Sequence, residues 1–535
     1  MNRLHTSLAC LGFVVAAASA SAQFYPPPPP AYPGLTNFNL RAANPYAAQW
    51  DVGLNIRGRF ENKDQAGFTS GGQNNDFRNG NSSNAQDNNN NYTLARVMPR
   101  IGYTDKWYQV FAQGRSSASF DDERGNSGLN NANPGLAAGK GEQENNRDMS
   151  LHQGFVAIGN HKEFPLSTKL GRQELVYGDH RQVGHFLWNN NARSFDAGKL
   201  RYQNSLGGVE LFTGSVVYHD NNAFDKSHYD DDKFSGAYFN FTKIPVVSKK
   251  QIVETYIYSR NVETASTRRD WSGVAAPFRQ PFVQDLYTAG LRIKSKPNAY
   301  GNWDYTAEGM HQFGTINSRA ADGQALRPIN TGPQLANAPE LTQDAYAAIA
   351  QVGYTWTEHA WQPRLSLTYS YASGDKNAKD GSSNTFQNQF ATTHFFYGYM
   401  DLNSLQNLHD LRLALEVRPT PKLRMAVEGH LQKLASTDDY WYNVGGVARG
   451  GVNQPGIASD GSATTSGTGY GINSGNSANL GTELDFIISY SPVPYFNIEG
   501  GVCHYFTGSY IDQSWANAGG SVDASYAYLQ LTLNL

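Results

Sequence analysis

The chain has 535 residues, of which 13% are aromatic and 53 are glycine, and its formal net charge is −3. This charge gives no support to a nucleic-acid partner, and no part of the chain has the composition of a linker between two cores. After the N-terminus no apolar run reaches the roughly 18 residues of a spanning helix, and mean hydropathy is −0.55. A polar chain that is rich in aromatic residues is typical of a transmembrane β-barrel, in which only alternate strand positions are apolar.

The N-terminus has the pattern of a secretory signal peptide over residues 1–22, with an apolar stretch at 8–18 and small residues before the expected cut. Cys10 lies inside the apolar stretch, which continues past it, so a lipoprotein site is set aside. Cys503 is then the single cysteine of the mature chain, and no intrachain disulfide can form.

A proline-rich stretch follows within residues 23–48, which we expect to be a periplasmic segment. A partner-docking role for it stays open. Residues 49–535 are expected to form the barrel. From Trp50 onward apolar and polar residues alternate, which predicts a strand with one apolar and one wet face.

The same alternation predicts about eighteen strands in an antiparallel outer-membrane β-barrel, an all-β fold. After the first strand these are expected at 92–104, 107–119, 151–159, 168–177, 198–203, 209–219, 234–242, 251–261, 285–294, 304–315, 345–355, 362–373, 409–418, 424–433, 481–491, 495–507 and 524–535. Links between them alternate short and long. The short links are expected to face the periplasm together with both chain ends.

Strand parity places most charged side chains on the wet face, because a charge on the lipid face would cost roughly 2 to 4 kcal/mol at the midplane. Arginine predominates over lysine there, and its planar guanidinium binds carboxylates with two parallel hydrogen bonds. The predicted pore-lining, substrate-binding residues are Arg57, Arg59, Arg96, Arg100, Arg115, Arg172, Glu174, Arg201, Arg292, Arg364 and Arg412. An alternative stays open, in which interleaved Arg and Glu pair with each other and only hold the wall together.

One stretch carries a more specific pattern. In order it contains Gly171-Arg172-Gln173-Glu174-Leu175, Tyr177-Gly178-Asp179, Trp188, Asn190, Ala192-Arg193-Ser194-Phe195-Asp196 and Leu200-Arg201. This series resembles the signature of the alginate-export family of outer-membrane barrels, and the resemblance is strongest over residues 92–260.

The resemblance implies a monomeric barrel of eighteen strands whose basic channel passes an anionic exopolysaccharide. Arg172 and Arg201 are then the expected polyanion contacts, while Arg193 and Asp196 could equally form a loop-closing ion pair. Because no periplasmic turn is long enough to plug the pore, any gate is expected from the external loops, chiefly 120–148 and 434–480. Outer-membrane lipid and lipopolysaccharide, and periplasmic export proteins, are the other expected partners.

Two other functions are considered. A hydrolase could use His180 or His185 near Asp179, or His219 with Asp220, but no supporting catalytic motif is present and an enzyme is not expected. A porin for uptake of small carboxylates or acidic oligosaccharides would share the barrel and its arginines.

Two acidic runs, 121–123 and 230–232, could bind calcium through hard oxygen ligands, but their spacing is not that of an EF-hand. They are interpreted as solvated loops. No metal and no cofactor are expected.

Overall fold

The computed structural model describes a defined part of the chain. The described residues are 34–66, 76–79, 89–122, 146–160, 162–218, 227–241, 243–262, 284–317, 340–377, 380–446, 449, 469–472 and 474–535. The expected signal peptide and most of the proline-rich stretch lie outside these residues.

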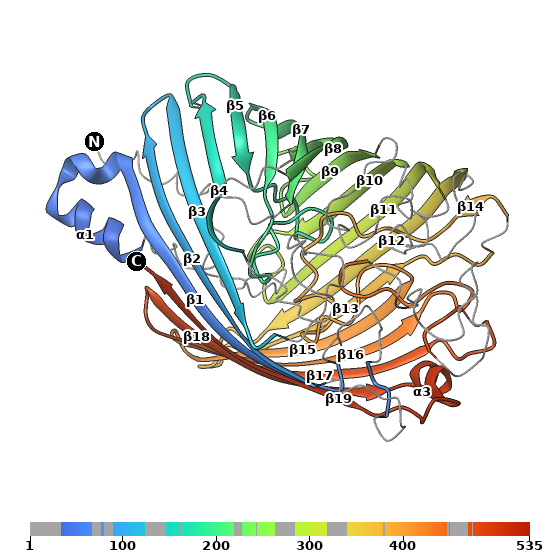
Figure 1. Cartoon of the computed structure of the whole chain (residues 1–535). Coiled ribbons are helices and arrows are strands. Elements are labelled where there is room, and N and C mark those ends of the chain that lie inside the picture. The colour runs from blue at the N-terminus through green and yellow to red at the C-terminus, as the bar shows by residue number, and fades with distance from the viewer. Residues whose placement is uncertain are drawn as a thin grey trace.

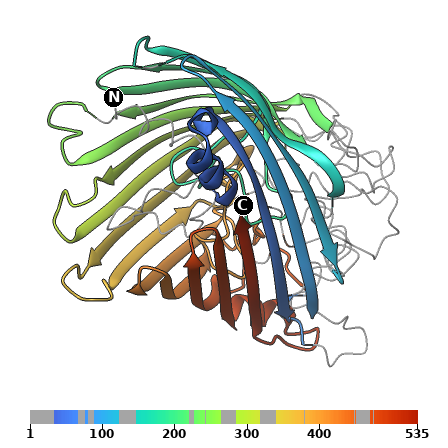
Figure 2. The ribbon, with the colours of Figure 1, turned by 90° about the vertical axis from the view of Figure 1, so that its left-hand side faces the viewer.

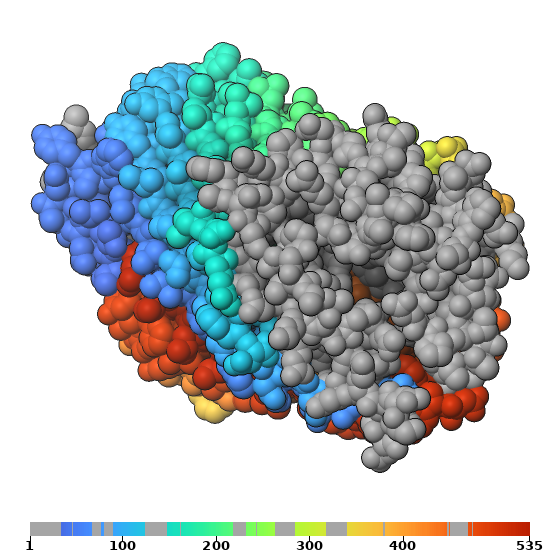
Figure 3. Space-filling view, in the orientation of Figure 1, coloured from blue at the N-terminus to red at the C-terminus, as the bar shows by residue number. Residues whose placement is uncertain are grey.

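Eighteen long strands form one closed antiparallel sheet (Figure 1). The barrel closes because β1 pairs with β2 on one side and with the C-terminal β19 on the other, and the first and last strands adjoin on the surface (Figure 3). The strands are β1 (Trp50–Asp64), β2 (Asn90–Thr104), β3 (Tyr108–Phe120), β4 (Asn146–Ile158), β5 (Leu166–Gln173), β6 (Phe195–Gln203), β7 (Gly207–Tyr218), β8 (Ser227–Phe241), β9 (Gln251–Val262), β10 (Gln284–Ser295), β11 (Trp303–Asn317), β12 (Glu340–Thr355), β13 (Arg364–Ala372), β15 (Leu408–Thr420), β16 (Leu423–Leu434), β17 (Asn479–Val493), β18 (Phe496–Thr507) and β19 (Ala524–Asn534).

The predicted fold and strand number are confirmed. A further strand of two residues, β14 (Ser382–Ser383), lies in a loop and pairs in parallel with β12. Each long strand alternates between an apolar outer face and a more polar inner face. In β12, for example, buried and exposed residues alternate along nearly the whole strand.

The short turns gather at one end of the barrel, together with the last residues of the chain. Tryptophan and tyrosine side chains surround this end, including exposed Trp50 beside half-buried Tyr103 and exposed Trp303 beside half-buried Tyr354. Such aromatic belts mark the interface between membrane and water, where an apolar ring with a polar tip is well placed.

A helix that was not predicted from the sequence, α1 (Leu35–Ala43), lies across the opening at this end (Figure 2). The Asn37 side chain donates to Asp51 at 2.6 Å and accepts from the Val52 amide at 2.8 Å, which ties α1 to the start of β1. A 3₁₀ turn, η1 (Pro45–Gln49), joins them, and α3 (Ser509–Trp515) lies between β18 and β19. Within the described residues, no helix is long and apolar enough to cross a membrane.

One predicted strand ends earlier than expected. The strand predicted at 168–177 is β5, which stops at Gln173. In a strand that continued to residue 177 with Arg172 toward the pore, as predicted, the alternation would put Leu175 and Tyr177 on the outer face, but both are buried inside the barrel. After Gln173 the chain leaves the sheet and turns into the interior, where these two side chains pack against other rings.

Candidate functional site

Two long loops fold into the barrel rather than away from it (Figure 1). We call residues 174–194, between β5 and β6, the first inner loop, and residues 373–407, between β13 and β15, the second inner loop. Nearly all of their side chains are buried or half-buried. They are the elements of the described chain that cross the interior, so the candidate site is built around them.

Arginines on β1, β2 and β3 donate hydrogen bonds to backbone carbonyl groups of the first inner loop. Arg57 and Arg96 are directly opposite each other on β1 and β2, and both donate to the Leu187 carbonyl, at 2.6 Å and 3.0 Å. Arg115 on β3 donates to the Asn191 carbonyl at 2.6 Å. These three side chains are predicted site residues, and the structure places them together against one loop.

Arg59 holds the same loop through an aromatic ring. Its guanidinium lies 3.7 Å from the centre of the Trp188 ring and also donates to the Trp188 carbonyl and to Glu61. The other face of Trp188 stacks on His394 of the second inner loop, with ring centres 3.6 Å apart. Arginine, tryptophan and histidine therefore form one stack from the wall of the barrel to its interior.

The start of the first inner loop is attached to the far wall. Asp179 accepts a hydrogen bond from Arg292 on β10, and Lys294 lies 3.6 Å from it. Burial by itself would raise the pKa of Asp179, but these two positive charges outweigh it and hold the pKa well below its usual range. Arg292 also donates to Glu254 on β9. The loop is thus anchored at both sides of the barrel.

The second inner loop is docked on the wall by hydrogen bonds to β16 and β17. The Met400 amide donates to Glu483 at 2.8 Å, and Gln432 donates to the Tyr397 carbonyl at 2.9 Å. Asn403 accepts from the Trp441 indole at 2.7 Å. Trp441 belongs to the external loop 434–480, so the described part of that expected gate packs on the second inner loop.

The two inner loops meet inside the barrel. The Gly184 amide donates to the Phe390 carbonyl and the Phe390 amide to the Gln182 carbonyl, each at 2.9 Å, which makes a short parallel bridge. Arg193 donates to the Phe390 and Ala391 carbonyls. The wall and both loops therefore form one connected structure across the lumen.

This arrangement was not predicted from the sequence. The gate was expected in loops 120–148 and 434–480, and most of loop 120–148 lies outside the described residues. A signal was present, because the first inner loop contains Trp188 and Phe186 among many asparagines but few charges. An external loop exposed to water has little reason to carry such large rings.

Several other predicted site arginines pair with carboxylates. This agrees with the alternative in which arginines and acidic residues pair with each other and hold the wall together. Arg364 donates to both oxygens of Asp304, Arg412 donates to Glu428, and Arg100 donates to Asp51. Glu174 pairs with His152 at 2.9 Å. Among these predicted residues, Arg201 is half-buried on the inner face and donates to Gln203 at 2.8 Å.

Arg172 has a different placement from the one predicted. It binds Asp196 through two hydrogen bonds, at 2.8 Å and 2.9 Å. On β6, the neighbours of Asp196 in the sequence, Phe195 and Ala197, are buried against the interior, so Asp196 points to the other face. On β5, Arg172 is two residues from Leu170, which is 56% exposed, so both point to the same outer face. The pair therefore lies on the outer face of the wall rather than on the pore face.

The described candidate hydrolase residues make other contacts. Asp179 is engaged by Arg292, and the rings of His180 and His185 pack edge to face, 4.9 Å apart. Burial lowers the pKa of His185 to about 3, so its imidazole is neutral at ordinary pH. His219 and Asp220 lie outside the described residues, as does one residue of the acidic run 121–123. The run 230–232 was interpreted as a solvated loop, but it lies in strand β8, where Asp232 pairs with Arg260.

The contact between the second inner loop and the external loop is expected to depend on pH. Asp439 accepts from Thr385 at 2.6 Å and from Tyr442 at 2.8 Å, and burial raises its pKa to about 6. Because the folded state then holds a proton that the unfolded state has lost, stability falls as pH rises through this window. The contact should be weaker at pH 7 than at pH 5 by about 1 kcal/mol.

Channel closures recorded at pH 5, 6 and 7 test this expectation. Asp439→Asn should remove the dependence, and the half-buried neighbour Asp438, changed to Asn, should leave it intact. A dependence that survives in Asp439→Asn would assign it to another group.

This barrel is similar in fold to solved structures of the outer membrane protein OpdK from Pseudomonas aeruginosa. OpdK with vanillate aligns with a TM-score of 0.52 at 10% identity, over 90% of this chain and 98% of that chain. OccK1 (OpdK) aligns with a TM-score of 0.51 at 10% identity, over 91% and 98%. No curated protein matches the chain.

The family comparison covers almost the whole barrel. The family model described as alginate export matches residues 48–522, which include every strand from β1 to β18 and both inner loops. The resemblance first seen in residues 171–201 therefore extends over the fold. The chain is a solute channel of the bacterial outer membrane and belongs to the alginate export family.

Proposed function

We propose that this channel passes an anionic polysaccharide, an alginate-like polyuronate, or a related acidic solute, and that cations of the inner wall guide it. The proposal rests on the family match over residues 48–522 and on the arrangement of charges near the short-turn end. A polymer of uronic acids carries one carboxylate on each sugar, so a row of cations suits it.

One observation carries the proposal. Lys169 on β5 and Lys199 on β6 lie directly opposite each other on the inner face. Like charges in this position are destabilising, and Arg201 follows on the same face two residues further. Lys199 binds Glu210 at 2.9 Å, while the Lys169 ammonium lies 3.6 Å from the centre of the Phe155 ring. Three basic side chains beside Glu210 and Glu174 form a basic patch of the inner wall that suits an acidic polymer.

Planar-bilayer recordings with and without uronate oligomers test the proposal. We expect the oligomers to block the current, and Lys169→Gln, Lys199→Gln and Arg201→Gln each to weaken the block by about tenfold, since hydrogen bonds to charged groups contribute about 1.5 to 3 kcal/mol. Lys106→Gln is the matched control, because Lys106 is exposed in a turn at the same end and pairs with Glu163.

A second candidate is a porin for small carboxylates. The meeting of the two inner loops across the lumen favours a small solute, and one of the similar solved structures is that of OpdK with vanillate. Block by a small aromatic carboxylate, with no effect of long uronate oligomers, would support this function and contradict polymer passage.

A further inference from the structure

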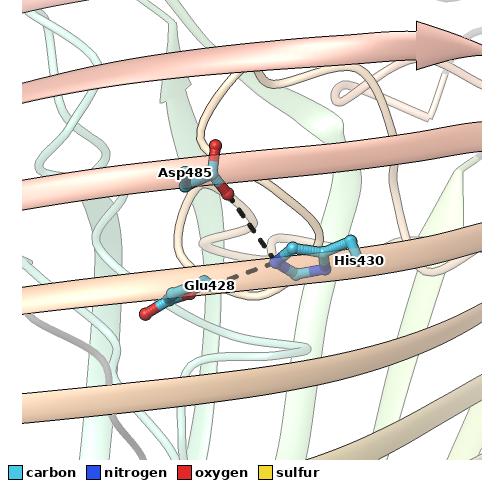
Figure 4. A group of neighbouring side chains, drawn as sticks. All are labelled: Glu428, His430 and Asp485. Carbon is cyan, nitrogen blue, oxygen red and sulfur yellow. Dashed lines mark ion pairs between the residues drawn. The ribbon is translucent and has the colours of Figure 1, made fainter.

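A second group of ionisable side chains lies within the wall, away from the contact between the inner loops. Glu428 and His430 on β16 and Asp485 on β17 point toward one another (Figure 4). The His430 Nε2 atom lies 4.0 Å from a Glu428 oxygen and 3.9 Å from an Asp485 oxygen. All three side chains are at most 2% exposed.

A fourth residue fixes the orientation of the imidazole. Asp410 on β15 lies 2.8 Å from the Nδ1 atom of His430. When the neutral imidazole donates its Nδ1–H to Asp410, its Nε2 atom carries the lone pair and faces the two carboxylates. The same carboxylate and histidine arrangement stands behind many metal-binding imidazoles, where it sets the tautomer and the ring angle.

One buried polar atom of this group is not satisfied by the protein. Within the described chain, His430 Nε2 has no hydrogen-bond partner, whereas the Asp485 carboxyl interacts with Cys503 and Glu483. Buried polar atoms are nearly always satisfied, because an unsatisfied one costs free energy. The His430 Nε2 atom faces one oxygen of Glu428 and one of Asp485 at distances too long for hydrogen bonds, which leaves room for a ligand between the three atoms.

The balance of charge indicates that this ligand is a cation. Four carboxyl groups lie close together here, those of Asp410, Glu428, Glu483 and Asp485. Arg412 donates to Glu428 at 2.7 Å, and His430 is the other basic group of the cluster. A dication would supply the positive charge that so many buried acids require.

We propose that Glu428, His430 and Asp485 bind one transition-metal dication of the Zn²⁺ type. One imidazole nitrogen and two carboxylate oxygens are ligands that zinc accepts at about 2.0 to 2.2 Å, and small side-chain rotations would bring the three atoms to that distance. Calcium prefers ligand sets made of oxygen alone. This site does not depend on the proposed function of the channel.

The position of the site also predicts an effect of the metal. Gln432 donates both to Asp410 at 3.1 Å and to the Tyr397 carbonyl of the second inner loop. Glu483 accepts from the Met400 amide of the same loop. Metal binding would hold together β16 and β17, the two strands on which that loop is docked, and it should slow the unfolding of the barrel.

The test uses the purified, folded full chain. After removal of metals with a chelator, the protein is dialysed against buffered zinc and its metal content is measured by mass spectrometry. We expect one zinc ion per chain, and its loss in His430→Gln and in Asp485→Asn. His311→Gln is the matched control, because His311 also pairs with an aspartate, Asp344, but is exposed on the outer face.

Heat-modifiable migration on gels verifies that each variant forms a closed barrel, and a second variant, Glu428→Gln, is measured where either of the others does not. Failure of the wild-type chain to bind zinc stoichiometrically overturns the proposal. So does retention of zinc in folded His430→Gln, or binding of calcium in place of zinc. None of these outcomes bears on the passage of acidic solutes, which the recordings with oligomers test separately.

Discussion

Replacing residues 177–193 with a short glycine and serine linker is expected to raise single-channel conductance severalfold. The first inner loop crosses the lumen from the arginines of β1–β3 to Arg292 on the far wall. The barrel itself should survive the change, because Gln173 and Phe195 are paired across β5 and β6 and a tight turn can join them. Planar-bilayer recordings measure the effect directly.

A smaller change loosens the first inner loop without removing it. Arg57→Gln with Arg96→Gln removes the guanidinium bonds to the Leu187 carbonyl but leaves the anchor between Asp179 and Arg292. We expect noisier current and a conductance between those of the wild type and the loop replacement. Unchanged conductance in the loop replacement, with the barrel closed, would show that the constriction lies elsewhere.

Replacing Arg364 with leucine is expected to destabilise the barrel by about 3 to 5 kcal/mol, because it leaves a buried carboxylate without its partner. Arg364 binds both oxygens of Asp304, at 2.9 Å and 2.6 Å, and the two side chains are 7% and 5% exposed. Gly353 makes room for the guanidinium, since a Cβ atom there would clash with Nη2. Urea unfolding of the barrel in detergent or lipid measures the loss.

The double variant Arg364→Leu with Asp304→Leu identifies the cause. Removing both charges should restore most of the stability, because the cost comes from the charge left behind rather than from the lost pair. Arg418→Leu is the control, since Arg418 also binds a glutamate but is 33% exposed, and it should cost far less. Equal losses in the single and double variants would mean that packing, and not charge, is responsible.

The strands of this protein were predictable because the constraint on them is local. One face of each strand meets lipid and the other meets a polar interior, so period two is imposed on every strand wherever it lies in the barrel. The alternation in β1 and the short turns between strands identified the architecture without any knowledge of distant contacts. The same parity correctly placed Arg57, Arg115 and Arg364 on the inner face.

The assignment of faces by strand parity was wrong where the chain leaves the sheet or comes near the end of a strand. Tyr177 was assigned to the outer face because the sequence shows no strand end at Gln173, and Arg172 was assigned to the pore although it shares the parity of Leu170. In both cases the error lies at the external end of β5. There the alternation of side chains continues in the sequence after the strand has stopped or has come close to its end.

The inner loops were not predictable in this way, since their positions depend on partners far away in the sequence. Arg57 binds a carbonyl 130 residues later, and Gly184 binds one in a loop that begins almost two hundred residues further on. The sequence shows which side chains are able to bind an acidic polymer. Folding decides which of them are engaged by carbonyls or carboxylates of the protein itself, because each buried arginine must find an acceptor among groups that only the closed barrel brings together.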